Sequence, residues 1–381
     1  MFEVPTVIAQ TLESNSLKPN LYLNHAGTSW PKPKVVLNAA AQAASAEPDQ
    51  WPNLFRESFD TVASFFHVDP SRLVLTPSCT SALNLAIMDQ RWQAGDRIVT
   101  SSFEHHALHR NLVKLSAQRI EVAQVEPNGN QIFDLARLKT LLQDSRTKLV
   151  AITAACNVTG ALLPFEQIIE LAHQYGSKIL LDGAQIAGWV DLDLVELGVD
   201  FFTFAGHKGT QAPWGIGGLY VAENSVMHCP TAACEFKPGT AKPYDSKPGY
   251  CDAGSVDLIA LAGLAAGCQW LSDETNADRL HNARQQAAEF TNRIRKIPAA
   301  GICHDFDFEK KMPTVAVNFG DDTPAIAKCL KENGIIASAG FQCSPLAHQQ
   351  IGTAEHGVIR FSFGPAKSNV DLERLFSVLT L

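Results

Sequence analysis

The chain has 381 residues, of which 46% are hydrophobic and 18% are charged, an ordinary composition for a folded globular protein. This composition excludes a long disordered or fibrous protein, and the length predicts two or three domains, with two favoured. The formal net charge of −8 argues against a nucleic-acid or anionic-membrane partner.

The cysteine pattern and the apolar stretches indicate the cellular compartment of the protein. Nine cysteines are spread singly, without a C-x-x-C pair, which is not the pattern of a secreted disulfide framework or a zinc site. Residues 1–5 include an early acid and no basic start, so they predict no signal peptide. The longest apolar stretch, 258–271, is too short to span a bilayer. We therefore expect a cytoplasmic protein.

In chain order, residues 21–23 form the first expected strand, and residues 34–46 are typical of a helix. From residue 72, strands and helices alternate, which predicts an α/β domain with a mostly parallel sheet covered by helices. Ligands of such sheets bind outside the carboxyl ends of the strands. Strands are expected at 72–75, 97–100, 119–125, 148–155, 178–181, 201–204 and 218–221, and helices at 78–88, 106–118, 134–143 and 164–175.

After residue 254 the pattern changes to that of a smaller α+β domain. Helices are expected there at 258–271, 279–296, 323–333 and 370–379, and strands at 314–319, 335–336 and 358–363. We therefore expect a large domain of residues 19–262 and a small domain of residues 1–18 and 263–381.

The strongest chemical signal is an acid and a lysine that each follow an apolar strand. Asp182 ends the expected strand 178–181, and Lys208 comes shortly after the expected strand 201–204. A lysine in an apolar site can have a lowered pKa and form a Schiff base. Such a pair suits pyridoxal phosphate (PLP), because the lysine binds its aldehyde and the acid keeps its pyridine nitrogen protonated. Each residue alone would more simply be a helix cap or a surface lysine, and the spacing does not decide.

Asp182-Gly183-Ala184-Gln185 and Gly206-His207-Lys208 resemble motifs of the class V aminotransferase and cysteine desulfurase family. The similarity extends over residues 20–375 and implies the architecture of fold-type I PLP-dependent enzymes, with PLP as cofactor. By this resemblance, Lys208 forms the Schiff base and Asp182 pairs with the pyridinium. Gln185 would then hydrogen-bond the phenolic oxygen of PLP, and His207 would contact its phosphate.

Further segments match the cofactor site of that family. The turn 76–81 between a strand and a helix offers N–H groups to an anion, and the resemblance assigns Cys79 and Thr80 to the PLP phosphate. Read alone, this turn would be a helix cap. His105 matches the histidine that stacks on the pyridine ring, and the histidines around it have no acid or cysteine cluster that would indicate a metal.

Two more cofactor residues follow from the resemblance. Asn157, after the expected strand 148–155, matches the asparagine that contacts the phenolic oxygen, although Asn-x-x-Gly alone would indicate a turn. Gly254-Ser255 resembles the turn through which a neighbouring subunit reaches the phosphate, with Ser255 as the contact. This match implies a homodimer.

One arginine, Arg360, lies inside the apolar strand 358–363. A buried arginine needs an anion, and a guanidinium fits a carboxylate through two hydrogen bonds. The partner is either an internal acid or a ligand. The family resemblance assigns Arg360, together with Asn24, to the carboxylate of an amino-acid substrate.

The segment 338–348 is expected to be a flexible, turn-rich loop with one cysteine, Cys343. It resembles the persulfide-forming loop of cysteine desulfurases, in the form A-G-x-x-C-x-P-L-A-H. The resemblance implies that L-cysteine gives L-alanine, that Lys208 takes the α-proton, and that Cys343 accepts the sulfur as a persulfide. A carrier protein or a small thiol would then remove this sulfur. The attacking thiol must be deprotonated, and His348 is a candidate for activating it.

The sequence departs from the family at several positions. Ala205 stands where many relatives have serine, Ser338 replaces an arginine, Phe341-Gln342 replace a pair that often contains histidine, and 230–239 has few glycines. Alternative functions are a class V aminotransferase or a PLP-dependent C–S or C–Se lyase similar to selenocysteine lyase. A nicotinamide oxidoreductase has little support, and a non-catalytic scaffold protein is disfavoured because all the reactive residues are present together.

Overall fold

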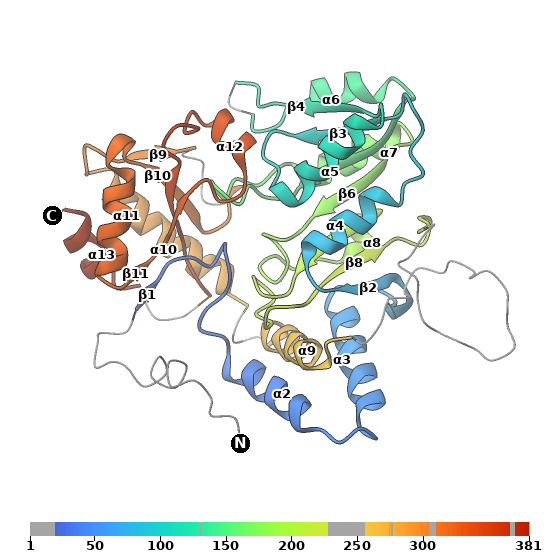
Figure 1. Cartoon of the computed structure of the whole chain (residues 1–381), viewed down its shortest axis with the longest axis horizontal. Coiled ribbons are helices and arrows are strands. Elements are labelled where there is room, and N and C mark those ends of the chain that lie inside the picture. The colour runs from blue at the N-terminus through green and yellow to red at the C-terminus, as the bar shows by residue number, and fades with distance from the viewer. Residues whose placement is uncertain are drawn as a thin grey trace, which may run out of the picture.

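The computed structural model describes residues 20–129, 131–227, 256–273, 275, 277–304, 310–365 and 370–380. These residues form two lobes, a larger one around a seven-stranded sheet and a smaller one around a four-stranded sheet (Figure 1). Every helix and strand predicted from the sequence is present, with ends that differ by at most about two residues. Within the described ranges, no helix is both long enough and apolar enough to cross a membrane.

The large sheet has the order β2-β8-β7-β6-β5-β3-β4, in which β8 alone runs antiparallel to its neighbours. Its interior strands are continuous apolar runs because helices cover both faces. The strands are β2 (Leu73–Thr76), β3 (Arg97–Ser101), β4 (Glu121–Val125), β5 (Thr147–Thr153), β6 (Lys178–Asp182), β7 (Phe201–Ala205) and β8 (Gly217–Val221).

The helices of the large lobe lie on both sides of this sheet (Figure 1). Helices α4 and α5 pack on each other, with α4 against β2, β6, β7 and β8 and α5 against β4, while α6 and α7 pack together and contact β4 and β6. The helices are α2 (Lys34–Ser45), α3 (Trp51–Phe65), α4 (Cys79–Met88), α5 (His106–Ala117), α6 (Leu135–Leu142), α7 (Phe165–Gln174), α8 (Leu194–Leu197) and α9 (Leu258–Ser272), with a 3-10 turn at Pro70–Arg72.

No element is predicted for residues 51–65, where the structure forms α3. Pro52 lies in the first turn of this helix, where proline is tolerated because the first N–H groups have no acceptor within the helix. The buried Val62 and Ala63 fix the helix against the core. Pro52 therefore does not break this amphipathic helix, although a proline in the sequence argues against predicting one.

Helix α9 is apolar all round and packs along α2 and α3. It crosses the expected domain boundary at residue 262, so we propose that the large domain continues to Ser272. At the other end of the large domain, β1 (Leu21–Tyr22) pairs with β11 (Ile335–Ile336) of the small lobe. The first described strand therefore ties the two lobes together.

The small lobe is an antiparallel sheet of order β12-β13-β10-β9 covered by helices. In its core, Phe290 of its longest helix packs at a tilt against Phe361, Phe363 and Phe376, with ring centroids 4.7–5.7 Å apart. The strands are β9 (Gly301–Cys303), β10 (Thr314–Asn318), β12 (Ser338–Gly340) and β13 (Val358–Ser362). The helices are α10 (Arg279–Ile294), α11 (Thr323–Glu332), α12 (Pro345–Gln350) and α13 (Leu372–Leu379), with a 3-10 turn at Gly320–Asp322.

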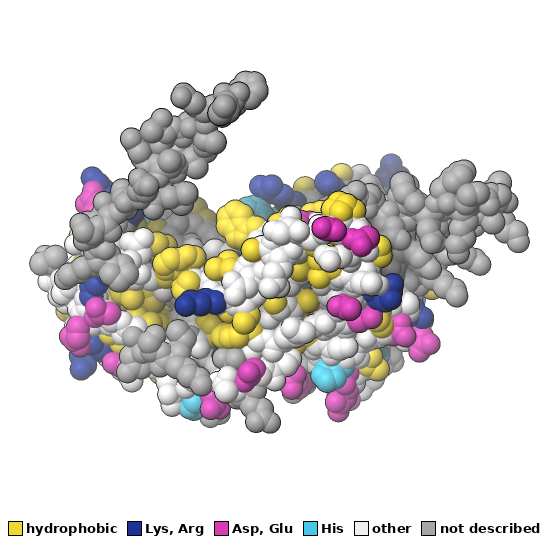
Figure 2. Space-filling view, turned by 90° about the horizontal axis from the view of Figure 1, so that it is seen from below, with side chains coloured by type: hydrophobic (Ala, Val, Ile, Leu, Met, Phe, Trp, Pro, Cys, Tyr) yellow, Lys and Arg dark blue, Asp and Glu magenta, His cyan; other side chains and the backbone are white. Residues whose placement is uncertain are grey.

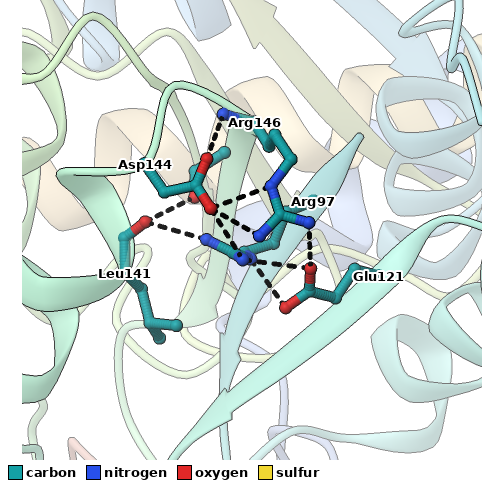
Figure 3. Close-up of polar contacts among 6 residues, drawn as sticks. Arg97, Glu121, Leu141, Asp144 and Arg146 are labelled. Atoms are coloured by element: carbon teal, nitrogen blue, oxygen red, sulfur yellow. Dashed lines mark hydrogen bonds and ion pairs between the residues drawn. The ribbon is translucent and has the colours of Figure 1, made fainter. Parts of the chain in front are cut away.

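An ion-pair network fixes the sheet at the end opposite to the carboxyl ends of its strands (Figure 3). Arg97, buried at the start of β3, donates to Glu121 Oε1 at 2.8 Å and to Asp144 Oδ2 at 3.2 Å. It also donates to the carbonyl oxygen of Leu141, and Arg146 binds the same two acids. Because the arginine satisfies several acceptors at once, it holds β3, β4 and the start of β5 in register.

Candidate active site

A cavity of about 330 Å³ opens at the carboxyl ends of β5, β6 and β7, between the two lobes. Apart from His348, it gathers every sequence-predicted site residue that the structure describes. These residues are Asn24, Cys79, Thr80, His105, Asn157, Asp182, Gln185, His207, Lys208, Cys343 and Arg360. Ser255 lies outside the described residues. A larger depression of about 590 Å³, near Phe133 and Phe165, contains none of these residues.

Asp182 and Lys208 face this cavity from neighbouring strands. Asp182 is buried at the end of β6, where its Oδ1 accepts the N–H of Ala184 at 2.9 Å and lies 3.5 Å from Cys79 Sγ. Burial raises the pKa of Asp182, and the nearby Lys208 opposes this shift. Burial lowers the pKa of Lys208, which Asp182 partly restores. Each group therefore favours the charged form of the other, against the effect of burial.

His105 caps α5, the helix that follows β3. Its Nδ1 accepts the N–H of Ala107 at 3.0 Å, which leaves Nε2 as the protonated nitrogen of a neutral ring. Burial lowers the pKa of His105 to about 4, with a further contribution from Lys208. A neutral, fixed imidazole at the cavity wall can stack on a planar heterocycle.

The buried carboxyl of Glu104 is a feature for which the sequence predicts no role. Its Oε2 accepts the N–H of Thr153 at 2.9 Å, and its Oε1 accepts from the N–H and hydroxyl of Ser101. Burial raises the pKa of Glu104 to about 8. The contacts join β3 to β5 directly behind His105. The signal that could have indicated Glu104 is an acid three positions after an apolar strand, beside the predicted cofactor residue His105.

The amino end of α4 forms a site for an anion. The Ser78 hydroxyl accepts the N–H of Ser81 at 3.2 Å, while the N–H groups of Cys79 and Thr80 in the first turn have no acceptor within the helix. A Cβ on Gly217 would lie 2.8 Å from the nitrogen of Cys79, so only glycine lets β8 approach the helix this closely. The helix dipole adds attraction for a phosphate at this point.

Two more predicted cofactor residues lie around this cavity. Burial lowers the pKa of His207 to about 4, and within the described chain its Nδ1 has no hydrogen-bond partner. A neutral ring with an unused nitrogen suits a contact with a ligand. Gln185 donates to the carbonyl oxygen of Ala26 at 3.1 Å, which fixes its amide against the turn after β1.

Arg360 is buried on β13 and reaches the cavity from the small lobe. Its Nη1 donates to the carbonyl oxygen of Asn157 at 2.7 Å, and its Nη2 donates to Asn24 Oδ1 at 2.8 Å. Burial lowers the pKa of Arg360 to about 10, so it stays charged at neutral pH. It forms no ion pair with a described acid, and its Nε has no partner there. A buried cation with an unused donor favours an external carboxylate over an internal acid.

Cys343 is exposed at the cavity, on a turn much shorter than the expected loop 338–348. The sequence prediction of a loop is wrong for most of this segment, because 338–340 form β12 and α12 begins at Pro345. Small residues and Pro345 suggested turns, but β12 pairs with β13 and proline starts a helix. Cys343, Lys208 and Arg360 line the same cavity, so the thiol shares it with the two cations.

The activating role considered for His348 does not agree with the structure. His348 is fully buried, with its Nδ1 2.7 Å from Thr353 Oγ1 and its Nε2 3.2 Å from Gln342 Oε1. Both nitrogens are therefore engaged by other residues, so the ring is not available as a base for Cys343. The sequence spacing alone could not show this, because the helix α12 turns the side chain away from the cavity.

A family model for Aminotransferase class-V matches residues 21–375 of the chain. The protein belongs to the class-V aminotransferase family. Among its relatives, a probable cysteine desulfurase from Vibrio cholerae is 29% identical over 389 residues, which cover 95% of this chain and 93% of the relative. A second probable cysteine desulfurase, from Mycolicibacterium paratuberculosis, is 30% identical over 365 residues and 88% of this chain. The chain spans about half, 51%, of that second relative.

Solved structures of cysteine desulfurases have the same fold. The cysteine desulfurase CsdA from Escherichia coli superposes with a TM-score of 0.85 at 24% identity, over 95% of this chain and 94% of that protein. This match confirms the predicted α/β architecture of fold-type I.

Proposed function

We propose that this class-V family member is a PLP-dependent cysteine desulfurase, which converts L-cysteine to L-alanine and stores the sulfur as a persulfide on Cys343. The observation that supports this most directly is the position of Cys343. Its thiol lies on the wall of the cavity that also contains Lys208 and Arg360. The names of the relatives from Vibrio cholerae and Mycolicibacterium paratuberculosis point to the same reaction.

The residues present fit PLP. The first turn of α4 offers unpaired N–H groups to a phosphate, with Thr80 and His207 beside it. The buried Asp182 matches a protonated pyridine nitrogen, and Lys208 matches an aldehyde. When bound, PLP supplies a heteroaromatic ring that accepts electrons from the α-carbon of an amino acid.

The protein's own side chains would then divide the remaining work. Arg360 and Asn24 bind and orient the substrate carboxylate. The Nζ of Lys208, whose pKa is lowered by burial, takes the proton from the α-carbon, because a neutral amine can act as a base. Asn157, through the free hydrogen of its amide, and Gln185 would hold the phenolic oxygen of the cofactor, and His105 would stack on its ring.

The sulfur step balances without an added oxidant. The Sγ of Cys343 forms a bond to the substrate sulfur while the bond from that sulfur to Cβ breaks. Cβ is reduced to the methyl group of alanine and takes up a proton, and the two sulfur atoms share the oxidation as a persulfide. Since Cys343 is exposed, an acceptor protein or a small thiol can then collect the sulfur.

Replacing Cys343 by alanine tests this function. The Cys343→Ala variant should bind PLP and L-cysteine with unchanged absorption spectra but lose alanine and persulfide formation. Cys329→Ala is the matched control, because Cys329 is partly exposed on α11 and lies away from the cavity. If Cys343→Ala keeps its turnover, the protein is an aminotransferase or a C–S or C–Se lyase instead.

We also propose that the enzyme is a homodimer. Large apolar side chains are exposed on and beside α2, α3 and α9, with 54% of Leu37, 48% of Trp51 and 45% of Ile259 exposed. Figure 2, which views this side, shows hydrophobic side chains gathered on it. Trp214, 72% exposed, lies beside His207, and its neighbour Pro213 contacts α9. A second copy would cover this surface close to the cofactor site.

Sedimentation of the purified protein tests the dimer. We expect twice the chain mass for the wild type and a shift toward the monomer for Trp51→Glu, because a charge there cannot be buried between two apolar faces. Val113→Glu, at an exposed apolar position on α5, is the control. A monomeric wild-type protein would contradict the proposal.

A further inference from the structure

The turn that carries Cys343 has an unfavourable backbone conformation. Gln342 and Cys343 both have positive φ angles, +42° and +57°. Residues with a Cβ rarely occupy this left-handed region, and two in succession are less common still. Such a turn persists only where contacts from its surroundings hold it. The conformation of the reactive cysteine therefore depends on its neighbours.

The large lobe holds the backbone of the turn. Asn157 Nδ2 donates to the carbonyl oxygen of Gln342 at 2.8 Å, and the buried Ser344 hydroxyl donates to Asn157 Oδ1 at 2.7 Å. At the start of α5, the N–H of His106 donates to the carbonyl oxygen of Cys343 at 2.8 Å. These contacts place the turn on the cavity wall.

The small lobe holds the side chain of Gln342. Its Nε2 donates to the carbonyl oxygens of Ser338 at 3.1 Å and Val358 at 3.4 Å. Its Oε1 can only accept, so His348 Nε2, 3.2 Å away, must be the donor. His348 Nδ1 then accepts the hydroxyl hydrogen of Thr353 at 2.7 Å. All polar atoms of the Gln342 amide are satisfied, and one tautomer of His348 is selected.

We propose that His348 is a positioning residue that acts through Gln342 to hold Cys343 in the conformation that accepts sulfur. His348 is not part of the cavity wall and touches neither Lys208 nor Arg360, so its effect on the reaction is indirect. The inference rests on the proposed desulfurase function for its role in turnover. The rigidity that His348 gives to the turn does not depend on that function.

A purely structural role for His348 would be to fill space, since its ring also packs edge-on against Phe341 at 5.3 Å. Two amide variants separate the roles. In His348→Gln the side-chain nitrogen can take the place of Nε2 and still donate to Gln342. In His348→Asn the shorter side chain places its nitrogen near the position of Nδ1, facing Thr353, and the contact with Gln342 is lost. If His348 only fills space, the effects of the two variants should be equal, because they would not depend on which hydrogen bond is kept.

The first readout is the alkylation rate of Cys343 by iodoacetamide in the PLP-loaded enzyme without substrate, followed by mass spectrometry of its peptide. We expect His348→Gln to react within about twofold of the wild-type rate, and His348→Asn at least about threefold faster, because the released turn is more mobile. Gln349→Asn, an exposed neighbour on α12, is the control and should match the wild type. Equal rates for the two His348 variants would overturn the proposal.

The second readout is turnover of L-cysteine. His348→Asn should lower kcat about tenfold with little change in KM, whereas His348→Gln should keep both. Gln342→Met, at a partly exposed position that tolerates the change, should lower kcat similarly, and adding His348→Asn to it should cause no further loss. Additive losses would show that His348 does not act through Gln342. If the wild type forms no persulfide, the desulfurase function fails, while the alkylation rates still decide the positioning role.

Discussion

The guanidinium of Arg360 lies 2.8 Å from the side-chain oxygen of Asn24, although 336 positions of sequence separate the two residues. This contact joins the turn after β1 to the central strand of the small lobe. It orients the arginine toward the cavity and leaves its Nε without a partner among the described residues. The proposed site for a substrate carboxylate therefore depends on contacts between the two lobes.

Replacing Arg360 by lysine should weaken binding of L-cysteine. A lysine has one point charge instead of a planar fork, so it cannot hold a carboxylate and Asn24 together. Losing one charged hydrogen bond should raise KM about 10- to 100-fold, with a smaller effect on kcat. Steady-state kinetics would show this, with Arg110→Lys on the exposed face of α5 as control. An unchanged KM would remove Arg360 from the substrate site.

The Asp182→Asn variant should stay folded and still bind PLP, because Oδ1 can keep its contact with the N–H of Ala184. It should turn over L-cysteine at least about 100-fold more slowly, since a neutral amide cannot stabilise a protonated pyridine nitrogen. Absorption spectra of the loaded variant and its rate of alanine formation measure both effects. Retention of full turnover would mean that the ring nitrogen pairs elsewhere.

Gly217→Ala should reduce the affinity for PLP. The added Cβ would lie 2.8 Å from the backbone nitrogen of Cys79 and 2.6 Å from the carbonyl oxygen of Phe204, and backbone atoms cannot move aside easily. The change displaces the first turn of α4, where the phosphate site is proposed. Fluorescence titration with PLP should show at least about tenfold weaker binding. Gly301→Ala, whose new Cβ would make only an ordinary contact with the carbonyl oxygen of Asn318 at 3.4 Å, should bind PLP as the wild type does.

Three histidines should make the cofactor-free protein less stable in mild acid. Burial lowers the pKa values of His25, His105 and His207 from 6.5 to about 4. Between these values the unfolded chain binds protons that the folded chain does not, so the free energy of unfolding falls as the pH decreases from 6.5 toward 4. Glu104 acts oppositely, because its raised pKa means that its contribution is lost as the pH rises from 4.5 to about 8.

The variant His25→Gln isolates the histidine effect, because Glu104 is present in both proteins. Urea unfolding at pH of about 7 and about 5 should show a smaller loss of stability for His25→Gln than for the wild type. Parallel losses in the two proteins would mean that His25 is protonated in the folded state.

Much of the architecture follows from the sequence because parallel strands buried on both faces are plain apolar runs. Asp182 and Lys208 stood out as polar residues that follow such runs, but their roles were predicted only from the resemblance of the motifs around them. Helix α3 was not predicted because of Pro52. This proline is tolerated only because it lies in the first turn, and the sequence does not show where the helix begins. The contact between Ser344 and Asn157 spans 187 positions, so it depends on tertiary packing that no local pattern encodes.

Local sequence patterns predict some features of the proposed site residues and not others. The exposed turn of Cys343 was expected, but its positive φ angles and the buried His348 beneath it depend on β12 and α12. The small residues and the proline of the segment 338–348 predict a loop, whereas the structure forms a strand there that pairs with β13. Hydrogen-bond partners from distant elements decide which side chains act and which only support them.

The most direct test is a single turnover of the PLP-loaded enzyme with L-cysteine, followed by amino-acid analysis and mass spectrometry of every cysteine peptide. The account predicts about one alanine per active site and one additional sulfur atom on the Cys343 peptide. Pyruvate in place of alanine, or alanine without extra sulfur on Cys343, would contradict it.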